Sequence, residues 1–361
     1  MSHWPAAGAG WRMTTQNPSF KPAADFAMAN ETPWDRDLAK VIGAGHFEPP
    51  PWNETIGHVR RRGGPAGLIV KGGEIVAEWG DADRPDMTFS VAKSFISLTI
   101  GLALDDGLIP DVDAPIRALV DDGGFDSNQN RPISWSHMLQ LSSEWEGELW
   151  DKPDVVDRNR DLGVEGKNPN KGKARELQAP GAFWEYNDVR VNRLALAAMR
   201  VWQDALPDVL NARIMAPIGA SETWEWHGYY NSWVEIGGRM RQSVSGGGHW
   251  GGGMFISARD QARVGLLMAR GGVWDGKRLI SEDYIARAKA PAPTNPDYGW
   301  LWWLNTGQNR FPSAPAGPFQ ASGAGGNTIW VDPERDLVIV ARWLDPGKLD
   351  AFLGLVYGAV A

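Results

Sequence analysis

Two β-hairpin patterns lie near opposite ends of this chain of 361 residues, and together they constrain its fold more than any other feature. The first covers residues 67–79, where Gly72 and Gly73 supply the positive φ that a tight turn needs. The second covers residues 327–341, with its turn at 332–336. Hairpins at both ends predict one antiparallel sheet that is assembled from both ends of the chain.

Helical patterns occupy most of the chain between and after the hairpins. Residues 90–104 are apolar nearly all round, which indicates a buried helix. Periodic apolar positions predict further helices within 134–141, 189–202 and 251–270, and a last helix at 349–360.

The order of these elements predicts an α+β fold, an α/β sandwich in which helices flank the antiparallel sheet. Residues 1–110 and 250–361 together form the expected α/β domain, and residues 111–249 form an inserted, mainly helical domain. Within the insertion, residues 151–178 carry many charges without a period. Such a stretch predicts either a functional lid or disorder.

Composition limits the partners and the location. The net charge of −8 disfavours binding to nucleic acid or to an anionic membrane, and the absence of cysteine excludes disulfides and thiolate chemistry. No secretory signal is visible, and the apolar stretch 95–104 is too short to span a bilayer, so we expect a cytoplasmic protein. The number of subunits stays open. Acidic composition and 20 tryptophans favour an apolar or cationic small-molecule substrate over an anionic one.

Ser90 and Lys93 are the first candidate catalytic residues. Positions three apart share one face of a helix, so the hydroxyl and the amine can touch. Exposed backbone N–H groups in the first helical turn favour an alkoxide on Ser90. A lysine on an otherwise apolar helix is costly unless it is paired or functional, which strengthens the assignment.

Two segments distant from this pair add further candidates. Tyr186 stands just before the predicted helix at 189–202, where a phenol can relay a proton to a leaving group. Residues 321–326 are small, so a strand edge there, with Ser322 and Gly323, can approach a substrate and offer a backbone N–H to an oxyanion. Either segment can also be purely structural, as packing or as a glycine bulge.

His249 and Trp250 lie between glycines and are candidates for the wall of an acyl-binding pocket, with tight packing as the alternative. Asp188 can cap the helix that follows it. No spacing of His, Asp or Glu suggests a metal site, and no cofactor is expected.

These motifs together resemble those of the serine β-lactamase and penicillin-binding-protein superfamily, in particular its β-lactamase-related esterases and the 6-aminohexanoate-dimer hydrolases. The resemblance covers roughly residues 60–345. It rests on residues 88–94, 133–143, 180–181 ahead of Tyr186, 247–260, 271–274 and 330–334.

The resemblance implies that an ester or amide acylates Ser90 and that Lys93 and Tyr186 share the proton transfers. The backbone N–H groups of Ser90 and Ala324 would form the oxyanion hole. Which of Lys93 and Tyr186 is the general base stays open, since two such groups titrate as a coupled pair.

Two positions depart from the pattern of the family. Ala321 stands where lysine or histidine often opens the third motif, and a lysine there binds the carboxylate of β-lactams and peptides. Asp188 stands where the second motif ordinarily ends in asparagine; an acid beside Lys93 would hold the lysine protonated and shift the role of base to Tyr186.

We therefore predict a metal-independent serine hydrolase that cleaves ester or amide bonds of small to medium-sized acyl compounds, with Asp188, His249, Trp250, Ser322 and Gly323 as substrate-binding candidates. One alternative is a β-lactamase or D-alanyl-D-alanine peptidase, against which Ala321 argues. The other is a non-catalytic binding protein with the same fold.

Overall fold

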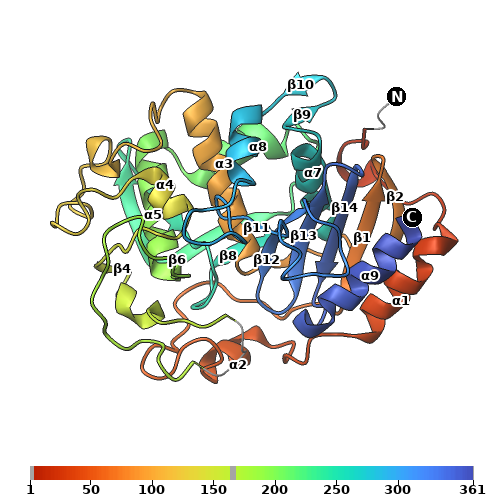
Figure 1. The fold of residues 1–361 in the computed structure, drawn as a ribbon, viewed down its shortest axis with the longest axis horizontal. Coiled ribbons are helices and arrows are strands. Elements are labelled where there is room, and N and C mark those ends of the chain that lie inside the picture. The colour runs from red at the N-terminus through yellow and green to blue at the C-terminus, as the bar shows by residue number, and fades with distance from the viewer. Residues whose placement is uncertain (1–3, 163–167, 361) are drawn as a thin grey trace.

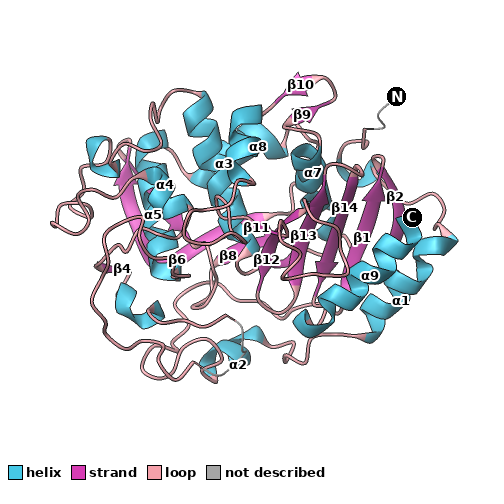
Figure 2. Ribbon diagram, in the orientation of Figure 1, coloured by secondary structure: helices cyan, strands magenta, loops and turns pink. Residues whose placement is uncertain are grey.

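A six-stranded sheet combines strands from both ends of the chain (Figures 1 and 2). The computed structural model describes residues 4–162 and 168–360. The strand order is β11-β12-β13-β14-β1-β2, and all neighbours are antiparallel. The two ends of the chain meet where Ile69 pairs with Ile339, so the predicted sheet is confirmed. Its strands are β1 (Ala66–Lys71), β2 (Glu74–Trp79), β11 (Trp303–Leu304), β12 (Phe319–Gly323), β13 (Asn327–Asp332) and β14 (Leu337–Arg342).

Helices cover both faces of this sheet, as the sandwich fold requires. Because successive side chains of a strand point to opposite faces, Leu68 and Val70 join one core and Ile69 joins another. Helix α7 (Ala258–Ala269) packs against β1, β13 and β14 on the first face. Helices α1 (Lys21–Ala29) and α9 (Leu349–Val360) cover the second face, and α9 has the bounds expected from the sequence (Figure 1).

The predicted buried helix is α3 (Val91–Asp105), which packs against α5, α6, β8 and β12 and has no solvated face along most of its length. Neighbours on all sides explain why its sequence is apolar nearly all round. The remaining helices are α2 (Leu38–Gly43), α4 (Trp135–Leu139), α5 (Asp188–Trp202), α6 (Leu206–Leu210) and α8 (Glu282–Ala288).

A second sheet of four strands, in the order β3-β8-β6-β7, corrects two expectations. The predicted helix at 251–270 begins only at Ala258, after strand β8 and after Ser257, whose side chain accepts a hydrogen bond from the Asp260 N–H. The region 111–249 also contains a hairpin, which turns at Gly237 and Gly238, both at positive φ. The strands are β3 (Asp86–Met87), β6 (Glu225–Ile236), β7 (Arg239–Val244) and β8 (Gly253–Ile256).

The division into two domains stays a prediction, and this second sheet takes strands from both of the predicted ranges. Short two-stranded ladders complete the strands: β4 (Glu148–Leu149) with β5 (Lys152–Pro153), and β9 (Val273–Trp274) with β10 (Lys277–Arg278).

Two long irregular segments run over the body of the fold. In the segment before β1, Trp34 packs on Phe89 of the turn that precedes α3. In the segment 151–178, a short 3-10 helix at Asp154–Asp157 precedes α5, while residues 163–167 lie outside the described part of the chain. Across residues 4–162 and 168–360, no helix is both long and apolar enough to cross a membrane.

Candidate active site

The turn before α3 presents Ser90. Phe89 has a φ of 51°, in the left-handed region that a residue with a side chain rarely adopts. Such a conformation costs about 1–3 kcal/mol and persists only where the surroundings hold it. Here the ring of Phe89 is fully buried and contacts the rings of Trp34, Phe47 and Trp343. Ser90 follows as the first residue of the helical turn, at the N-cap position of α3.

Lys93 reaches back to this hydroxyl. Its Nζ donates to Ser90 Oγ over 2.9 Å, and it also donates to the Gly246 carbonyl oxygen over 3.3 Å. Only 1% of the lysine is exposed, and its ammonium forms an ion pair with Asp188. The helical spacing thus brings Ser90 and Lys93 together as predicted from the sequence.

Tyr186 lies beside Lys93. The Lys93 Nζ is 4.7 Å from the centroid of the tyrosine ring, and the Arg160 guanidinium carbon is 5.0 Å from it. The ring is stacked on Trp303 of β11, with 5.9 Å between centroids and 17° between planes. Since Tyr186 immediately precedes the N-cap residue of α5, the start of that helix fixes its position.

The end of β12 lies against the start of α3. A Cβ atom on Gly323 would lie 2.0 Å from the Thr88 carbonyl oxygen and 3.1 Å from the Ser90 nitrogen, so no larger residue fits there. The structure therefore brings the backbone of the predicted small-residue segment to the turn that carries Ser90.

One cavity of about 250 Å³ joins these groups. Ser90, Tyr186, Ser322, Gly323 and Ala324 line it, as the sequence-based assignment requires. Its other lining residues come from four separate segments of the chain: Trp34, His46, Phe47, Arg160, Asp161, Leu162, Asn168, Lys171, Trp303, Arg310 and Pro346.

Asp188 supports Lys93 from behind the cavity. Its carboxylate contacts Lys93, the Arg160 Nη1 at 3.2 Å and the His249 Nε2 at 2.9 Å. Burial raises the pKa of this carboxyl, but the charges of His249, Lys93 and Arg160 outweigh burial and hold the pKa well below its usual range. The helix cap is instead Asn187, whose side chain accepts from the Arg190 N–H. Of the two alternatives for Asp188, the position beside Lys93 is confirmed and the helix cap is wrong, while a contact with substrate stays a prediction.

His249 and Trp250 are both buried and are not among the residues that line the cavity. Trp250 is fully buried and donates its indole N–H to the Trp52 carbonyl oxygen. His249 lies between two carboxylates, with Nδ1 at 3.2 Å from Glu48 and Nε2 at 2.9 Å from Asp188, and stacks on Phe47. Its neighbour Phe47, from the N-terminal segment, forms the wall.

The glycines beside His249 have a packing role. A Cβ on Gly247 would lie 2.6 Å from Asp188 Oδ1 and one on Gly246 would lie 2.7 Å from Val191. Side chains at these positions would separate the backbone from the Lys93–Asp188 pair.

Several residues of the site carried no sequence signal of their own. Arg160 and Lys171 belong to the charged, aperiodic stretch, and both are held by buried carboxylates: Lys171 contacts Glu48, and it is 3.0 Å from Asp157. Burial raises the pKa of Asp157, but Lys171 and Arg160 lower it to about 2. Burial and the charge of Asp157 raise the pKa of Glu48. Only the density of charges in this stretch hinted at such a network.

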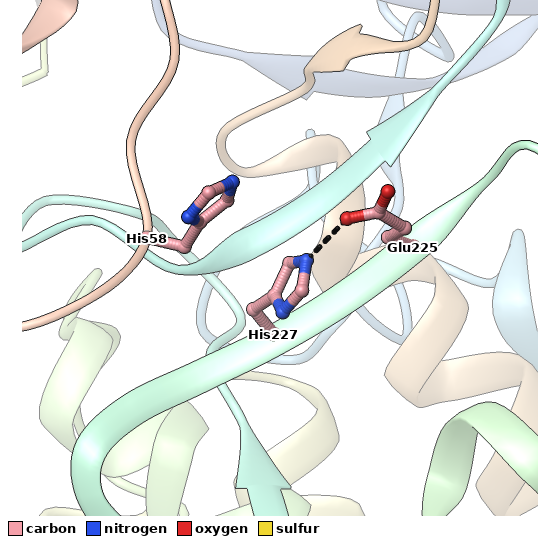
Figure 3. Close-up of side chains that lie close together, drawn as sticks. All are labelled: His58, Glu225 and His227. Atoms are coloured by element: carbon pink, nitrogen blue, oxygen red, sulfur yellow. Dashed lines mark hydrogen bonds and ion pairs between the residues drawn. The ribbon is translucent and has the colours of Figure 1, made fainter.

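Two groups of residues in the described part of the chain have the donor atoms of a metal site. Glu48, Asp157 and His249 belong to the network above. The second group is His58, Glu225 and His227, in which His227 hydrogen-bonds to Glu225 (Figure 3). Arg60 donates to both His58 Nε2 and Glu225 Oε2, so the protein's own cation already engages these donors.

Comparisons with known proteins show which sequences and folds this chain is similar to. The family model described as Beta-lactamase matches residues 52–343. A curated 6-aminohexanoate-dimer hydrolase of Paenarthrobacter ureafaciens is 26% identical over 311 residues, which cover 77% of this chain and 72% of that protein.

Among solved structures, a family VIII carboxylesterase has a TM-score of 0.61 at 16% identity, with 96% of this chain and 99% of that chain covered. A penicillin-binding-protein homologue from Caulobacter crescentus has a TM-score of 0.58 at 18% identity, with 90% and 98% covered. At these identities the likeness is one of fold.

Proposed function

Because the chain belongs to the Beta-lactamase family, we propose that it is a serine hydrolase that cleaves ester or amide bonds of small to medium-sized acyl compounds through an acyl-enzyme on Ser90. The observation that carries the proposal is the 2.9 Å contact between Lys93 Nζ and Ser90 Oγ, with the hydroxyl lining a cavity that also holds Tyr186 and the edge of β12. The names of a dimer hydrolase and a carboxylesterase among the similar proteins support both bond types.

In the proposed first step, Ser90 Oγ forms a bond to the substrate carbonyl carbon and its proton passes to the Lys93–Tyr186 pair. The Lys93 ammonium, which pairs with the Asp188 carboxylate, stabilises the developing alkoxide by its charge. Tyr186 is then the group that accepts the proton and returns it to the leaving alcohol or amine.

In the second step, water attacks the acyl carbon and gives a proton to the Lys93–Tyr186 pair, which returns it to Ser90 Oγ as the bond between this oxygen and the acyl carbon breaks and the acid leaves. The backbone N–H groups of Ser90 and Ala324 stabilise the oxyanion in both steps. The approach of β12 to the Ser90 nitrogen supports this assignment.

A fluorophosphonate probe tests the nucleophile. We expect the probe to label the wild-type protein and not Ser90→Ala. Ser94→Ala is the matched control, since this serine lies one turn further along α3, donates to the Leu301 carbonyl oxygen and does not line the cavity. Ser94→Ala should be labelled like the wild type. Absence of labelling in all three proteins would instead support a non-catalytic binding protein.

The type of acyl substrate is tested with a panel of p-nitrophenyl esters and a chromogenic cephalosporin. We expect higher kcat/KM for the esters, because the third motif opens with the fully buried Ala321 and that strand position lacks the lysine of the family's pattern. A preference for the cephalosporin by orders of magnitude would favour the β-lactamase alternative.

A further inference from the structure

Arg310 places a guanidinium in the wall of the catalytic cavity. It lies on the loop between β11 and β12, and its guanidinium carbon is 3.8 Å from the centroid of the Trp303 ring. Trp303 in turn stacks on Tyr186 and pairs across the strands with Gln320, the neighbour of Ala321. The stacking fixes the cation beside the catalytic tyrosine and next to the third motif.

Arg310 has no carboxylate partner among the residues that the structure describes. Within residues 4–162 and 168–360 it makes no ion pair, and no side chain or carbonyl accepts a hydrogen bond from it. Burial lowers the pKa of this guanidinium, and Asp297 acts on it only at a distance. Arg310 is half-buried, and a partly desolvated cation without a partner favours a bound anion.

The other two cations of the cavity are already committed. Arg160 pairs with Asp157 and Asp188, and Lys171 pairs with Glu48 and Asp157. The one carboxylate among the described lining residues is Asp161, which is exposed. Among the lining residues that the structure describes, Arg310 is therefore the cation that has no carboxylate partner, although the whole chain carries a net charge of −8.

We propose that Arg310 binds a carboxylate of the substrate, so that the esters or amides hydrolysed at Ser90 are those of acyl compounds that carry a negative charge. This inference rests on the proposed function. This proposal replaces the apolar or cationic substrate expected from composition. A charge such as that of Arg310, in direct contact with the substrate, outweighs the more distant and screened charges that make up the net charge of the molecule. Arg310 supplies from the neighbouring loop the cation that Ala321 lacks.

The planar guanidinium suits a carboxylate, to which it can donate two parallel hydrogen bonds. A charge-assisted bond of this kind changes binding by about 10- to 100-fold. A neutral substrate of the same shape leaves the cation unpaired and gains nothing from it.

The test compares matched pairs of esters that differ in one charge. In the first pair the acyl part differs, as p-nitrophenyl hydrogen adipate against p-nitrophenyl hexanoate. In the second pair the leaving group differs, as the butyrate ester of 4-hydroxybenzoate against that of methyl 4-hydroxybenzoate. In at least one pair we expect wild-type kcat/KM to favour the charged ester by about 10- to 100-fold.

Arg310→Gln should remove this preference, by lowering kcat/KM on the charged ester far more than on the neutral ester, and Arg310→Lys should keep part of it. The matched control is Arg287→Gln, since Arg287 also lies over a tryptophan, Trp300, but does not line the cavity. An equal loss on charged and neutral esters in Arg310→Gln, or no preference in the wild type, would overturn the inference.

Binding to Ser90→Ala separates this inference from the proposed function. Calorimetry with hexanoate and with hexanamide should show tighter binding of hexanoate, and the difference should vanish when Arg310→Gln is added. If that difference is found but no ester is hydrolysed and no fluorophosphonate label appears, the anion site stands and the hydrolase proposal fails. If hydrolysis is found without the difference, the hydrolase proposal stands and the role of Arg310 fails.

Discussion

The Lys93 ammonium touches a hydroxyl, a carboxylate and a backbone carbonyl, and each comes from a different segment of the chain: Ser90, Asp188 and Gly246. Its position is therefore fixed on three sides. If the ammonium stabilises the Ser90 alkoxide, its loss should affect the rate far more than the fold.

We expect Lys93→Ala to reduce kcat/KM on its best ester by about 10²- to 10⁴-fold, because the variant loses the charge beside Ser90 and one partner in the proton transfers. Asp188 keeps Arg160 and His249 as partners, so the variant should still fold. Steady-state kinetics measure the first effect and circular dichroism the second.

Lys152→Ala is the control for this variant. Lys152 is also buried, and it lies 5.6 Å from the ring centroids of Trp52 and Trp250, outside the cavity. Near-normal activity in Lys93→Ala, or an equal loss in Lys152→Ala, would show that the role of Lys93 is misassigned.

For single residues, the sequence predicts contacts within one helix but not contacts between segments that are far apart in the chain. The Ser90–Lys93 contact follows from helical spacing alone. The contacts of Asp188 with His249 and Arg160 join residues far apart in the chain, and no local pattern encodes them. The sequence likewise did not predict a role for Arg310. That role follows from its contact with the Trp303 ring and from the lack of a carboxylate partner among the described residues.

Among the elements, the N-terminus of α5 positions two residues of the candidate site. The Asn187 side chain caps this helix by accepting a hydrogen bond from the Arg190 backbone N–H. Its amide nitrogen also donates to the Asp154 carbonyl oxygen over 2.8 Å. Tyr186 stands immediately before this cap and Asp188 immediately after it. Loss of the cap should therefore disturb both residues at once.

We expect Asn187→Ala to lower the free energy of unfolding by about 1–2 kcal/mol, because a helix cap of this kind contributes about that much. We also expect a lower kcat, since the Tyr186 ring and the Asp188 carboxylate lose their support. Urea denaturation and ester kinetics measure the two effects.

Ser281→Ala serves as the comparison. Ser281 caps α8 by accepting from the Tyr284 N–H, and it does not line the cavity. It should lose a similar amount of stability with little change in kcat. If both variants lost activity in proportion to their stability, the cap of α5 would have no special link to the site.

The elements differ in how well their sequences reveal them. Helices α3 and α9 were predictable because their apolar periods are long and uninterrupted. Strands β6, β7 and β8 were missed: β6 mixes exposed and buried positions irregularly, and β8 is a short apolar run next to glycines. A short run of this kind cannot be told from the start of a helix by period alone.

For the whole molecule, the buried charge network makes stability depend on pH. The carboxyl pKa values of Asp157 and Asp188 are depressed in the folded state, to about 2 for Asp157. A depressed pKa stabilises the folded protein above the unfolded value, here near 3.8, and this contribution is lost as the pH falls through the folded value. Glu48 acts in the opposite sense because its pKa is raised.

We therefore expect the free energy of unfolding to fall as the pH is lowered from about 4 towards about 2, with the two depressed carboxyls outweighing the single raised one. Urea denaturation at several pH values measures this dependence. Asp157→Asn should be less stable than wild type near neutral pH and show a shallower fall in acid. A parallel fall in the two proteins would contradict the assignment.

The pairing of β1 with β14 also determines when the proposed activity can begin during synthesis. A ribosome releases residues 66–79 long before residues 327–342, and a two-stranded hairpin alone is at best marginally stable in water. Helix α3 packs on β12 and β13, which follow it far along the chain. Ser90 thus gains its full surroundings only after residues 319–342 have been translated, and a nascent chain that stops before them carries Ser90 without the strand that completes the candidate site.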